Sequence, residues 1–508
     1  MGIINLFTEI VRLFNPLNLI TVLLAVQLGI IFGMLPGLTA TMAIALLTSL
    51  TFRWETGNAI LVLIAIYVGT IYGGSRSAIL INIPGTPANA ATCLDGFPLA
   101  KSGKGAQAIG LATMSSFLGS FVGLLALVLF APILGRMALD FKSFEIFWLT
   151  LFGVAICGNL TAPTDPIKGW IAGIAGILLS FVGMEAIQGY PRFTFGILEL
   201  NAGFSIIPVL VGTYGLVEIL DNLTIGDIKA VIMNVGRVIP HFKDIIKNGV
   251  NIVRSGIIGV FIGIIPGVGE IIASYVAYDF AKRSSKHPEK YGKGSIEGLI
   301  ASETANNACV GGALVPVLSL AIPGSPPAAV LLAALWLHGL RPGPLLQIEN
   351  PNYIFEFSAI FFYASLAMLI LGLLIVKPLL KILQIKSSIL MPIIFLLCTI
   401  GTFAINGRLF DIWVMIIFGI IGYSMRKFGY PSTPLVLGLI LGPMVDENLR
   451  RGLILTNGNF LPFFKSTISI ILVIAIFLTL FGKTKIVKSV FGLLLQPIRY
   501  AAKLIKNR

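Results

Sequence analysis

The stretch 82–88 reads Asn-Ile-Pro-Gly-Thr-Pro-Ala and the stretch 321–328 reads Ala-Ile-Pro-Gly-Ser-Pro-Pro-Ala, so that Gly324 follows Gly85 by 239 residues. Each copy interrupts an apolar segment. Proline lacks an N–H for the helical ladder and glycine turns freely, so each motif breaks a helix. Inside a bilayer, such a break is tolerated only where the irregular backbone is buried in protein or lines a polar cavity. Two matched breaks in two halves of an apolar chain predict the solute site of a transporter.

The rest of the chain has the composition of a membrane protein. Of the 508 residues, 56% are hydrophobic and 11% are charged, whereas soluble domains average about 25% charged residues. The mean hydropathy is +0.95, and apolar runs such as 106–134 and 354–376 reach the length of about 20 residues that a spanning helix needs. We therefore predict an all-α polytopic integral membrane protein with roughly ten to twelve embedded elements. Residues 1–16 lack a basic n-region and a cleavage site, so no cleavable signal peptide is expected.

The formal net charge of +14 is concentrated beside the apolar segments. Basic residues gather in the stretches 229–254, 282–293 and 483–508, and the last of these contains no acid. This distribution indicates cytoplasmic loops and contacts with membrane lipid rather than a surface for nucleic acid. Leucines and isoleucines among the charges of 483–508 predict an amphipathic helix on the cytoplasmic membrane surface.

The sequence lacks the usual motifs of metal and nucleotide chemistry. Its four cysteines are isolated, its three histidines form no HExxH spacing, and no Walker A pattern occurs. Neither a metal centre nor direct ATP hydrolysis is expected, and we do not expect an enzyme. The remaining enzymatic alternative is a membrane-embedded acid–base pair of Glu303 and His338, which has no evident nucleophile beside it.

Five landmarks recur in the same order in both halves, which predicts an internal repeat. Besides the two motifs above, Pro36-Gly37 matches Pro266-Gly267, Gly96 matches Gly339, Trp170 matches Trp413, and Gly189-Tyr190-Pro191 matches Gly429-Tyr430-Pro431. We divide the chain into an N-terminal segment 1–16, repeat 1 at 17–221, a basic cytoplasmic linker 222–255, repeat 2 at 256–447, a last loop and span at 448–482, and the cytoplasmic tail 483–508.

The apolar segments on either side of Pro36-Gly37 and Pro266-Gly267 are short for a full crossing. Basic stretches flank the second pair on both sides, so we expect re-entrant hairpins that turn at these Pro-Gly pairs. With the hairpins counted as returning, each repeat has five crossings, and an odd number inverts the second repeat. One span more or fewer would instead make the repeats parallel.

The polar residues at the two breaks are candidates for solute binding. A new helix starts after each break, and its unpaired N–H groups and positive dipole end bind carboxylates. The predicted site consists of Asn82, Gly85, Thr86 and Asn89 at the first break and of Gly324 and Ser325 at the second. It favours a small organic anion as the solute. The alternative is that the Pro-Gly pairs are structural kinks.

A second set of candidates concerns ion coupling or bracing of the site. Glu303, Asn306 and Asn307 follow helical spacing and would share one face of a helix. Burying an ionisable group at membrane depth costs free energy, so our default hypothesis is that such a group has a function. Glu303 is therefore either a proton carrier or cation ligand, or else a structural partner of Arg76.

The coupling cation is either Na⁺ or H⁺, and the sequence does not choose between them. Unwound carbonyls near Gly85 and Gly324, together with Asn, Ser and Thr oxygens, would suit Na⁺. Glu270, which follows the second hairpin turn, is a weaker candidate. No other cofactor is expected.

Several of these stretches resemble a known family. Residues 291–298 (Tyr-Gly-Lys-Gly-Ser-Ile-Glu-Gly), 303–307 (Glu-Thr-Ala-Asn-Asn) and 338–344 (His-Gly-Leu-Arg-Pro-Gly-Pro) closely resemble the large permease subunit of the tripartite tricarboxylate transporters. In the first half, 72–75, 82–85, 95–98 and 191–196 match the same family. The family usually has proline before the glutamate, whereas this chain has Ser302, so the helix start near Glu303 is expected to differ.

The resemblance implies a multi-pass protein of the bacterial cytoplasmic (inner) membrane. It implies import of a tricarboxylate or related organic carboxylate by cation-coupled alternating access. The expected partners are a small membrane subunit and a periplasmic solute-binding protein that delivers the solute. The alternative is a carboxylate permease of the same build that works without a binding protein.

Overall fold

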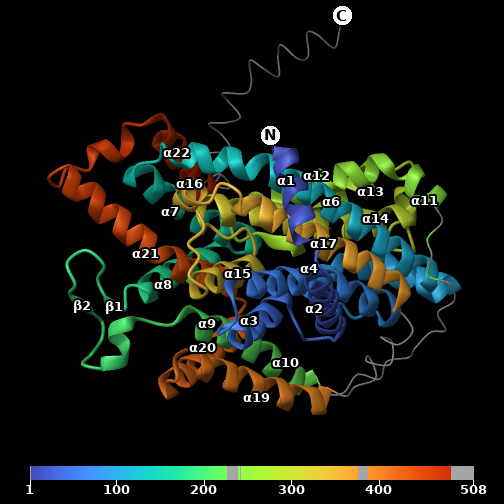
Figure 1. Ribbon diagram of the computed structural model, residues 1–508, viewed down its shortest axis with the longest axis horizontal. Coiled ribbons are helices and arrows are strands. Elements are labelled where there is room, and N and C mark those ends of the chain that lie inside the picture. The colour runs from blue at the N-terminus through green and yellow to red at the C-terminus, as the bar shows by residue number, and fades with distance from the viewer. Residues whose placement is uncertain (1, 226–237, 239, 241, 376–386, 482–508) are drawn as a thin grey trace, which may run out of the picture.

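The structure is a computed structural model that describes residues 2–225, 238, 240, 242–375 and 387–481. The first half contains, in order, α1 (Gly2–Leu13), α2 (Pro16–Met34), α3 (Ala40–Thr51), α4 (Thr56–Ile81), η1 (Pro87–Asn89), α5 (Ala90–Leu99), η2 (Ala100–Lys104), α6 (Gly105–Ala138), α7 (Ser143–Thr161), α8 (Pro166–Ser180), β1 (Gly183–Met184), β2 (Pro191–Arg192), η3 (Leu198–Ala202), α9 (Ile206–Leu210), η4 (Val211–Leu216) and α10 (Val217–Ile225) (Figure 1). The predictions for the tail 483–508 and for linker residues 226–237 lie outside the described residues.

The second half again has a helical hairpin, a long helix that ends at a Pro-Gly break and a new helix after it, but none of its described residues forms a strand. It contains α11 (Phe242–Lys247), α12 (Gly249–Ile264), α13 (Gly269–Ser284), η5 (Pro288–Lys290), α14 (Ile296–Leu320), α15 (Pro326–Leu337), α16 (Pro344–Glu349), α17 (Tyr353–Leu374), α19 (Ser387–Asn406), α20 (Leu409–Lys427), α21 (Ser432–Leu455), η7 (Leu461–Phe464) and α22 (Thr467–Phe481). Among the described residues, eight helices are long and apolar enough to cross a membrane. This confirms the prediction of an all-α polytopic membrane protein.

The two predicted hairpins and the two predicted breaks are present as local structure. α2 ends at Met34 before Pro36-Gly37, and α3 begins after Thr39, whose hydroxyl accepts the N–H of Met42 at 3.2 Å. α12 and α13 are separated in the same way by Pro266-Gly267. At the breaks, α4 and α14 both end on a left-handed residue, Asn82 with φ 59° and Ala321 with φ 57°. The Pro-Gly pairs therefore end helices at matching places in both halves.

One landmark of the predicted repeat is wrong. Gly96 lies inside α5, whereas Gly339 follows the end of α15 and has φ 81°. In the first half the helix continues into η2, and Gly103 takes the left-handed conformation with φ 83°. The sequence match between Gly96 and Gly339 misleads because the helix after the first break runs on past its glycine.

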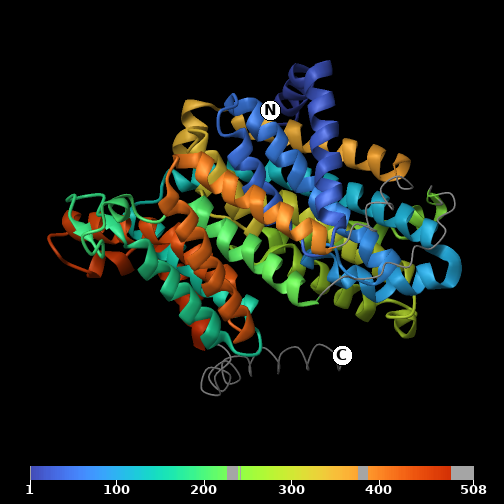
Figure 2. The ribbon, with the colours of Figure 1, turned by 90° about the horizontal axis from the view of Figure 1, so that it is seen from below.

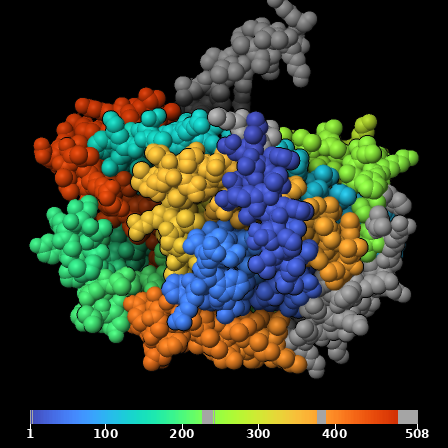
Figure 3. Space-filling model, viewed as in Figure 1, coloured from blue at the N-terminus to red at the C-terminus, as the bar shows by residue number. Residues whose placement is uncertain are grey.

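The halves interlock rather than standing side by side. α6 of the first half packs on α14, and α17 of the second half packs on α4; likewise α8 packs on α21, and α20 packs on η4. Glycines permit close approach within each half, because a Cβ on Gly33 would lie 2.1 Å from Thr70 O of α4 and one on Gly263 would lie 2.5 Å from Cys309 O of α14. Side chains of distant segments accordingly form one continuous face (Figure 3).

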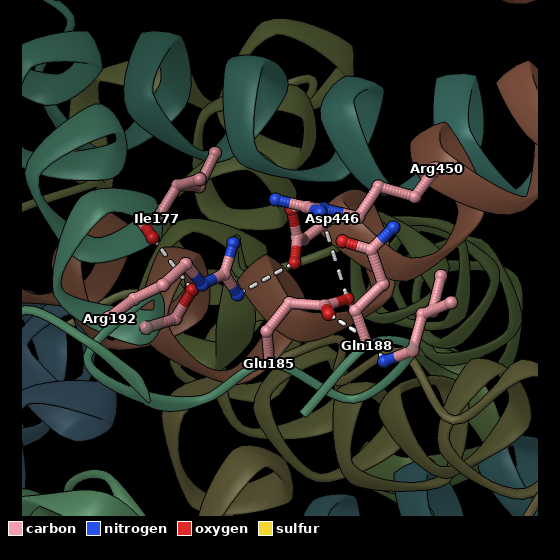
Figure 4. A network of polar contacts seen from close by, with 8 residues as sticks. Ile177, Glu185, Gln188, Arg192, Asp446 and Arg450 are labelled. Atoms are coloured by element: carbon pink, nitrogen blue, oxygen red, sulfur yellow. Dashed lines mark hydrogen bonds and ion pairs between the residues drawn. The ribbon is translucent and has the colours of Figure 1, made fainter. Parts of the chain in front are cut away.

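α7, α8, α21 and α22 form a group at one side of the molecule (Figures 1 and 2). The segment between α8 and α9 is fixed to α21 by a polar network (Figure 4). Arg192 and Arg450 bind the two carboxylate oxygens of Asp446 at 2.8 and 3.0 Å. Glu185 accepts the N–H groups of Ile187 and Gln188 at 2.9 and 2.5 Å. This network orders the segment outside the helices.

Candidate functional site

Each Pro-Gly loop rests against the hairpin that precedes it. A Cβ on Gly85 would lie 1.9 Å from Gly33 O, and one on Gly324 would lie 2.0 Å from Gly263 O, so both positions require glycine. In the second half the contact includes hydrogen bonds, because the N–H of Gly267 donates to Pro323 O at 3.1 Å and that of Gly269 donates to Gly324 O at 3.2 Å. The breaks and the hairpin turns therefore meet at one place in each half.

A cavity of about 710 Å³, which we call the central cavity, lies where these parts converge. Its wall takes residues from the hairpin turns, the two Pro-Gly loops, the α7–α8 turn, the α20–α21 turn and the η4–α10 segment. The contributing stretches are 39–41, 86–88, 160–165, 213–214, 217–218, 267–272, 326–327 and 429–433, with Ile71, Lys168 and Arg426.

Six helices begin at this wall: α3, α5 through η1, α8, α13, α15 and α21. The first N–H groups of a helix have no partner within the helix, and the N-terminal end of its dipole carries roughly half a positive charge. Ser325 caps α15 by accepting the N–H of Ala328 at 3.3 Å, and because Pro326 and Pro327 carry no N–H, the start of α15 contributes its dipole rather than free donors. The wall is therefore suited to an anion.

The wall also carries charged side chains. Arg426 binds Glu218 at 2.5 Å and also binds Asp221, so two carboxylates outweigh its single positive charge. Glu270 accepts a hydrogen bond from the hydroxyl of Tyr67 at 2.5 Å, and the Tyr67 oxygen lies 2.8 Å from the Ser325 hydroxyl. The second hairpin is thereby fastened to α4 and to the start of α15.

Glu303 lies behind the wall and is fully buried. Its Oε1 accepts hydrogen bonds from the hydroxyl of Thr92 at 2.5 Å and the amide of Asn89 at 3.3 Å, and its Oε2 accepts one from Ser116 at 2.8 Å. Asn89 in turn accepts the hydroxyl of Thr86, a wall residue, at 2.6 Å. A chain of two hydrogen bonds thus connects Glu303 to the central cavity.

Several polar atoms near Glu303 are buried without a hydrogen-bond partner. These are both amide atoms of Asn306, Oδ1 of Asn307 and the hydroxyl of Thr304. Asn307 donates its amide to the backbone oxygen of Glu303 at 3.1 Å. Unpartnered oxygens at this depth are unusual, since buried polar groups nearly always find partners.

The alternative that Glu303 pairs with Arg76 is wrong. Among the described residues no ion pair joins the two side chains. Arg76 is buried and donates to the Tyr72 hydroxyl at 3.1 Å and to Gly372 O at 2.9 Å. The sequence places both residues at membrane depth but does not fix the rotation of α4 against α14, which decides their contact.

The enzymatic pairing of Glu303 with His338 is also wrong. The His338 ring lies 3.4 Å from the hydroxyl of Thr51 at the end of the first hairpin, whereas Glu303 is bound to Thr92, Asn89 and Ser116. Among the described residues no group of three or more histidine, cysteine or acidic side chains could hold a metal ion.

The predicted solute-binding residues and the predicted hairpin-turn residues lie at different places relative to the central cavity. Thr86 belongs to the wall of the central cavity, as does Gly267 of the second hairpin turn. Four predicted residues are buried directly behind the wall, next to wall residues in the sequence: Gly85, Asn89, Gly324 and Ser325. The hairpin turns contain the predicted residues Pro36, Gly37 and Pro266. Asn82 is exposed and does not reach the cavity, because it caps the end of α4 four residues before Thr86, the first wall residue of the loop.

Sequence reasoning missed Lys168 and the α7–α8 turn. Lys168 stands in the first turn of α8, a helix that begins at Pro166 after Asp165. A basic residue at the start of an otherwise apolar helix is the signal that could have indicated it.

A second hollow of about 810 Å³ lies between α8 and α20 and is lined by exposed apolar side chains such as Ile171, Leu178 and Ile420. Its surface suits lipid rather than a polar solute.

Comparison with known proteins agrees with this architecture. Residues 19–437 match the family described as "Tripartite tricarboxylate transporter TctA family". An "Uncharacterized 52.8 kDa protein in TAR-I ttuC' 3'region" of Agrobacterium vitis is 35% identical over 459 residues, which is 90% of this chain and 91% of that protein. An "Uncharacterized protein in TAR-II ttuC' 3'region" of the same organism is 35% identical over 211 residues, covering 42% of this chain and 87% of that protein.

No solved structure matches this chain. The family is one of membrane transporters, which disfavours the enzymatic alternative. The match covers both hairpins, both Pro-Gly loops and the whole wall of the central cavity. This chain therefore belongs to the TctA family of tripartite tricarboxylate transporters.

Proposed function

We propose that this chain is the membrane permease subunit of a secondary transporter that imports an organic carboxylate by cation-coupled alternating access. The observation that carries the proposal is the start of six helices at the wall of one central cavity. The dipoles of these helices, together with the N–H groups that remain unpaired at the starts not formed by proline, favour a carboxylate. A solute bound in this way can be released again, as transport requires.

Glu303, Asn306 and Asn307 are proposed to couple transport to the cation. Glu303 has no basic partner among the described residues, and the neighbouring asparagines carry unpartnered oxygens. Oxygen ligands suit Na⁺, and the same carboxylate could carry a proton. The hydrogen bonds through Asn89 to Thr86 give a physical route by which occupancy at Glu303 affects the wall.

We further propose that the repeats are inverted, with alternating access arising from motion of one half against the other. The open end of the first hairpin, opposite its Pro-Gly turn, lies beside the end of α15, since Thr51 contacts His338. The second opens toward the end of α5, since Asn251 at the start of α12 donates to Glu297 O at 2.9 Å and Asp95 accepts the N–H of Ser295 at 2.7 Å.

The length of α6 supports this assignment. α6 begins after α5, and near its far end Pro132 O accepts the Gln347 amide of α16, which follows α15, at 3.2 Å. Its 34 residues span about 50 Å at 1.5 Å per residue, more than the hydrocarbon core. The two hairpins therefore open toward opposite ends of α6. The basic stretch 282–293 lies at the α5 end, which favours that end as cytoplasmic.

The proposed partners are a small membrane subunit and a periplasmic solute-binding protein, and the proposed location is the bacterial inner membrane. The family description as tripartite supports both partners. Reconstitution tests the proposal: liposomes that contain this chain with the membrane subunit should take up carboxylate only with the binding protein present and with a Na⁺ or proton gradient imposed. Robust uptake by this chain alone would contradict the need for partners and favour the stand-alone permease.

Site-directed cysteine labelling tests the inversion separately. In a background without the four native cysteines, single cysteines are placed near the open ends of the two hairpins, at Gly57 in the first turn of α4 and at Ser284 at the end of α13. Membrane-impermeant maleimide should label Gly57→Cys only from the periplasmic side and Ser284→Cys only from the cytoplasmic side. Labelling of both from one side would refute inversion.

A further inference from the structure

Lys168 is a wall residue of the central cavity whose charge has no partner. Its ammonium donates to Phe428 O at 2.8 Å and lies 5.2 Å from the centroid of the Tyr430 ring. Within the described part of the chain no carboxylate forms an ion pair with it, although Asp165 lies three residues earlier. A lysine ammonium has three N–H donors, so two remain for a further acceptor.

The other cation of the wall differs from Lys168 in this respect. Arg426 is held by two acids, Glu218 and Asp221, which together outweigh its single positive charge. The two wall cations, Lys168 and Arg426, both lie beside the α20–α21 turn. Of these two wall cations, Lys168 alone is left with an unbalanced charge.

Lys168 also belongs to a different part of the wall from the Pro-Gly loops. The loops and hairpin turns form one part, which contains the starts of α5, α13 and α15. Lys168 lies in the other part, formed by the α7–α8 and α20–α21 turns, where α8 and α21 start. A solute that touches both parts would meet helix starts and the Glu270 carboxyl group in the first part and the Lys168 ammonium in the second.

We propose that Lys168 is a specificity-determining residue that binds a second anionic group of the solute. This inference rests on the proposed function, because it assumes that a first carboxylate is bound at the helix starts. The Tyr430 ring and Phe428 O hold the ammonium in place, and its free donors complete the contact with the second group. Solutes with two or more anionic groups are thereby favoured over monocarboxylates.

The test compares solutes of equal chain length with the full chain in lipid nanodiscs. Succinate and butyrate have four carbons each and differ by one carboxylate, so calorimetric titration of both isolates the second anionic group. Lys168→Gln keeps an N–H donor for Phe428 O but removes the charge, and Lys168→Arg keeps the charge. Lys465→Gln, at a lysine outside the wall, is the matched control.

We expect Lys168→Gln to weaken succinate binding by about tenfold or more, the usual effect of losing a charged hydrogen bond. Butyrate has no second anionic group to contact Lys168. Its affinity should therefore stay within about twofold of the wild-type value, well below the tenfold change that 1.4 kcal/mol represents. Lys168→Arg should retain most of the preference, and Lys465→Gln should match the wild type. Equal weakening of both solutes would overturn the proposal, because it would assign Lys168 a purely structural role in capping the end of α20. No change in either solute would overturn it as well.

Failure of the proposed function would look different. In that case the wild-type chain would bind neither succinate, butyrate nor citrate, whatever residue stands at position 168. Melting temperatures of all variants, measured in the same nanodiscs, identify any variant that is not folded, and Lys168→Arg then serves as the second test of charge at this position.

Discussion

Replacing Glu303 by glutamine should separate coupling from folding. The carboxylate accepts three hydrogen bonds, two at Oε1 and one at Oε2. Glutamine can keep Thr92 and Asn89 on its carbonyl oxygen, while its NH₂ group faces Ser116. The Ser116 hydroxyl must then rotate and accept one N–H, while the second N–H is left without a partner in this buried place, which costs about 1 kcal/mol or more.

The effect on transport should be much larger than the effect on stability. If Glu303 binds Na⁺, the substitution removes a charged contact worth about 1.5 to 3 kcal/mol, or roughly a 10- to 100-fold weaker activation by the cation. If it carries a proton, glutamine cannot do so at all. We therefore expect gradient-driven uptake below about a tenth of the wild-type rate at a fixed gradient, which is the tenfold loss that 1.4 kcal/mol represents.

The assay is solute uptake into proteoliposomes, with the concentration of Na⁺ or the pH gradient varied. The control is Glu145→Gln, since Glu145 is also a buried carboxylate but accepts the N–H of Lys142 at the start of α7. The control should keep its cation dependence. Unchanged uptake and cation dependence in Glu303→Gln, with normal insertion, would show that Glu303 only braces the site and would refute the coupling role.

Two further predictions concern stability. Gly324→Ala places a Cβ 2.0 Å from Gly263 O, so it should cost about 1 to 3 kcal/mol or more of overpacking and lower the melting temperature, whereas Gly57→Ala, in open space, should not. Hydrogen bonds from the N–H groups of Gln188 and Ile187 hold the pKa of Glu185 below its usual value. Because a depressed folded-state pKa stabilises above the unfolded-state pKa of about 4.3, this contribution should be lost as pH falls through the folded-state pKa. Melting curves of wild type and Glu185→Gln should therefore differ at pH 7 and approach each other in acid; parallel curves at all pH values would contradict the assignment.

The helix breaks and hairpin turns could be predicted from the sequence, because they depend on the backbone preferences of neighbouring residues. A proline followed directly by glycine ends a helix in this chain, so the breaks at Gly85 and Gly324 and the turns at Gly37 and Gly267 follow from the sequence. The rule does not extend to Gly96, because a glycine without proline before it is tolerated inside a helix at a cost of only about 1 kcal/mol.

The contacts between helices could not be predicted in the same way. Whether Glu303 meets Arg76 or Thr92 depends on how α14 is rotated against α4, α5 and α6, and one helical position changes the direction of a side chain by about 100°. The position of Lys168 depends on the packing of α8 against α21, which are separated by about 250 residues. Residues 213–214, 217–218 and 160–165 join the wall for the same reason, since they hold no motif of their own.

The interlocking of the halves has a consequence for how the protein is made. α4 and α6 pack on α17 and α14, which are synthesised roughly two to three hundred residues later. At a synthesis rate of about 5 to 20 residues per second, the faces of α4 and α6 that meet these later helices wait for ten seconds or more in the membrane. During that time lipid or another membrane protein must cover them. The first half therefore cannot complete its core before the second half is inserted, and a chain that stops at the linker should remain unpacked and be removed by quality control.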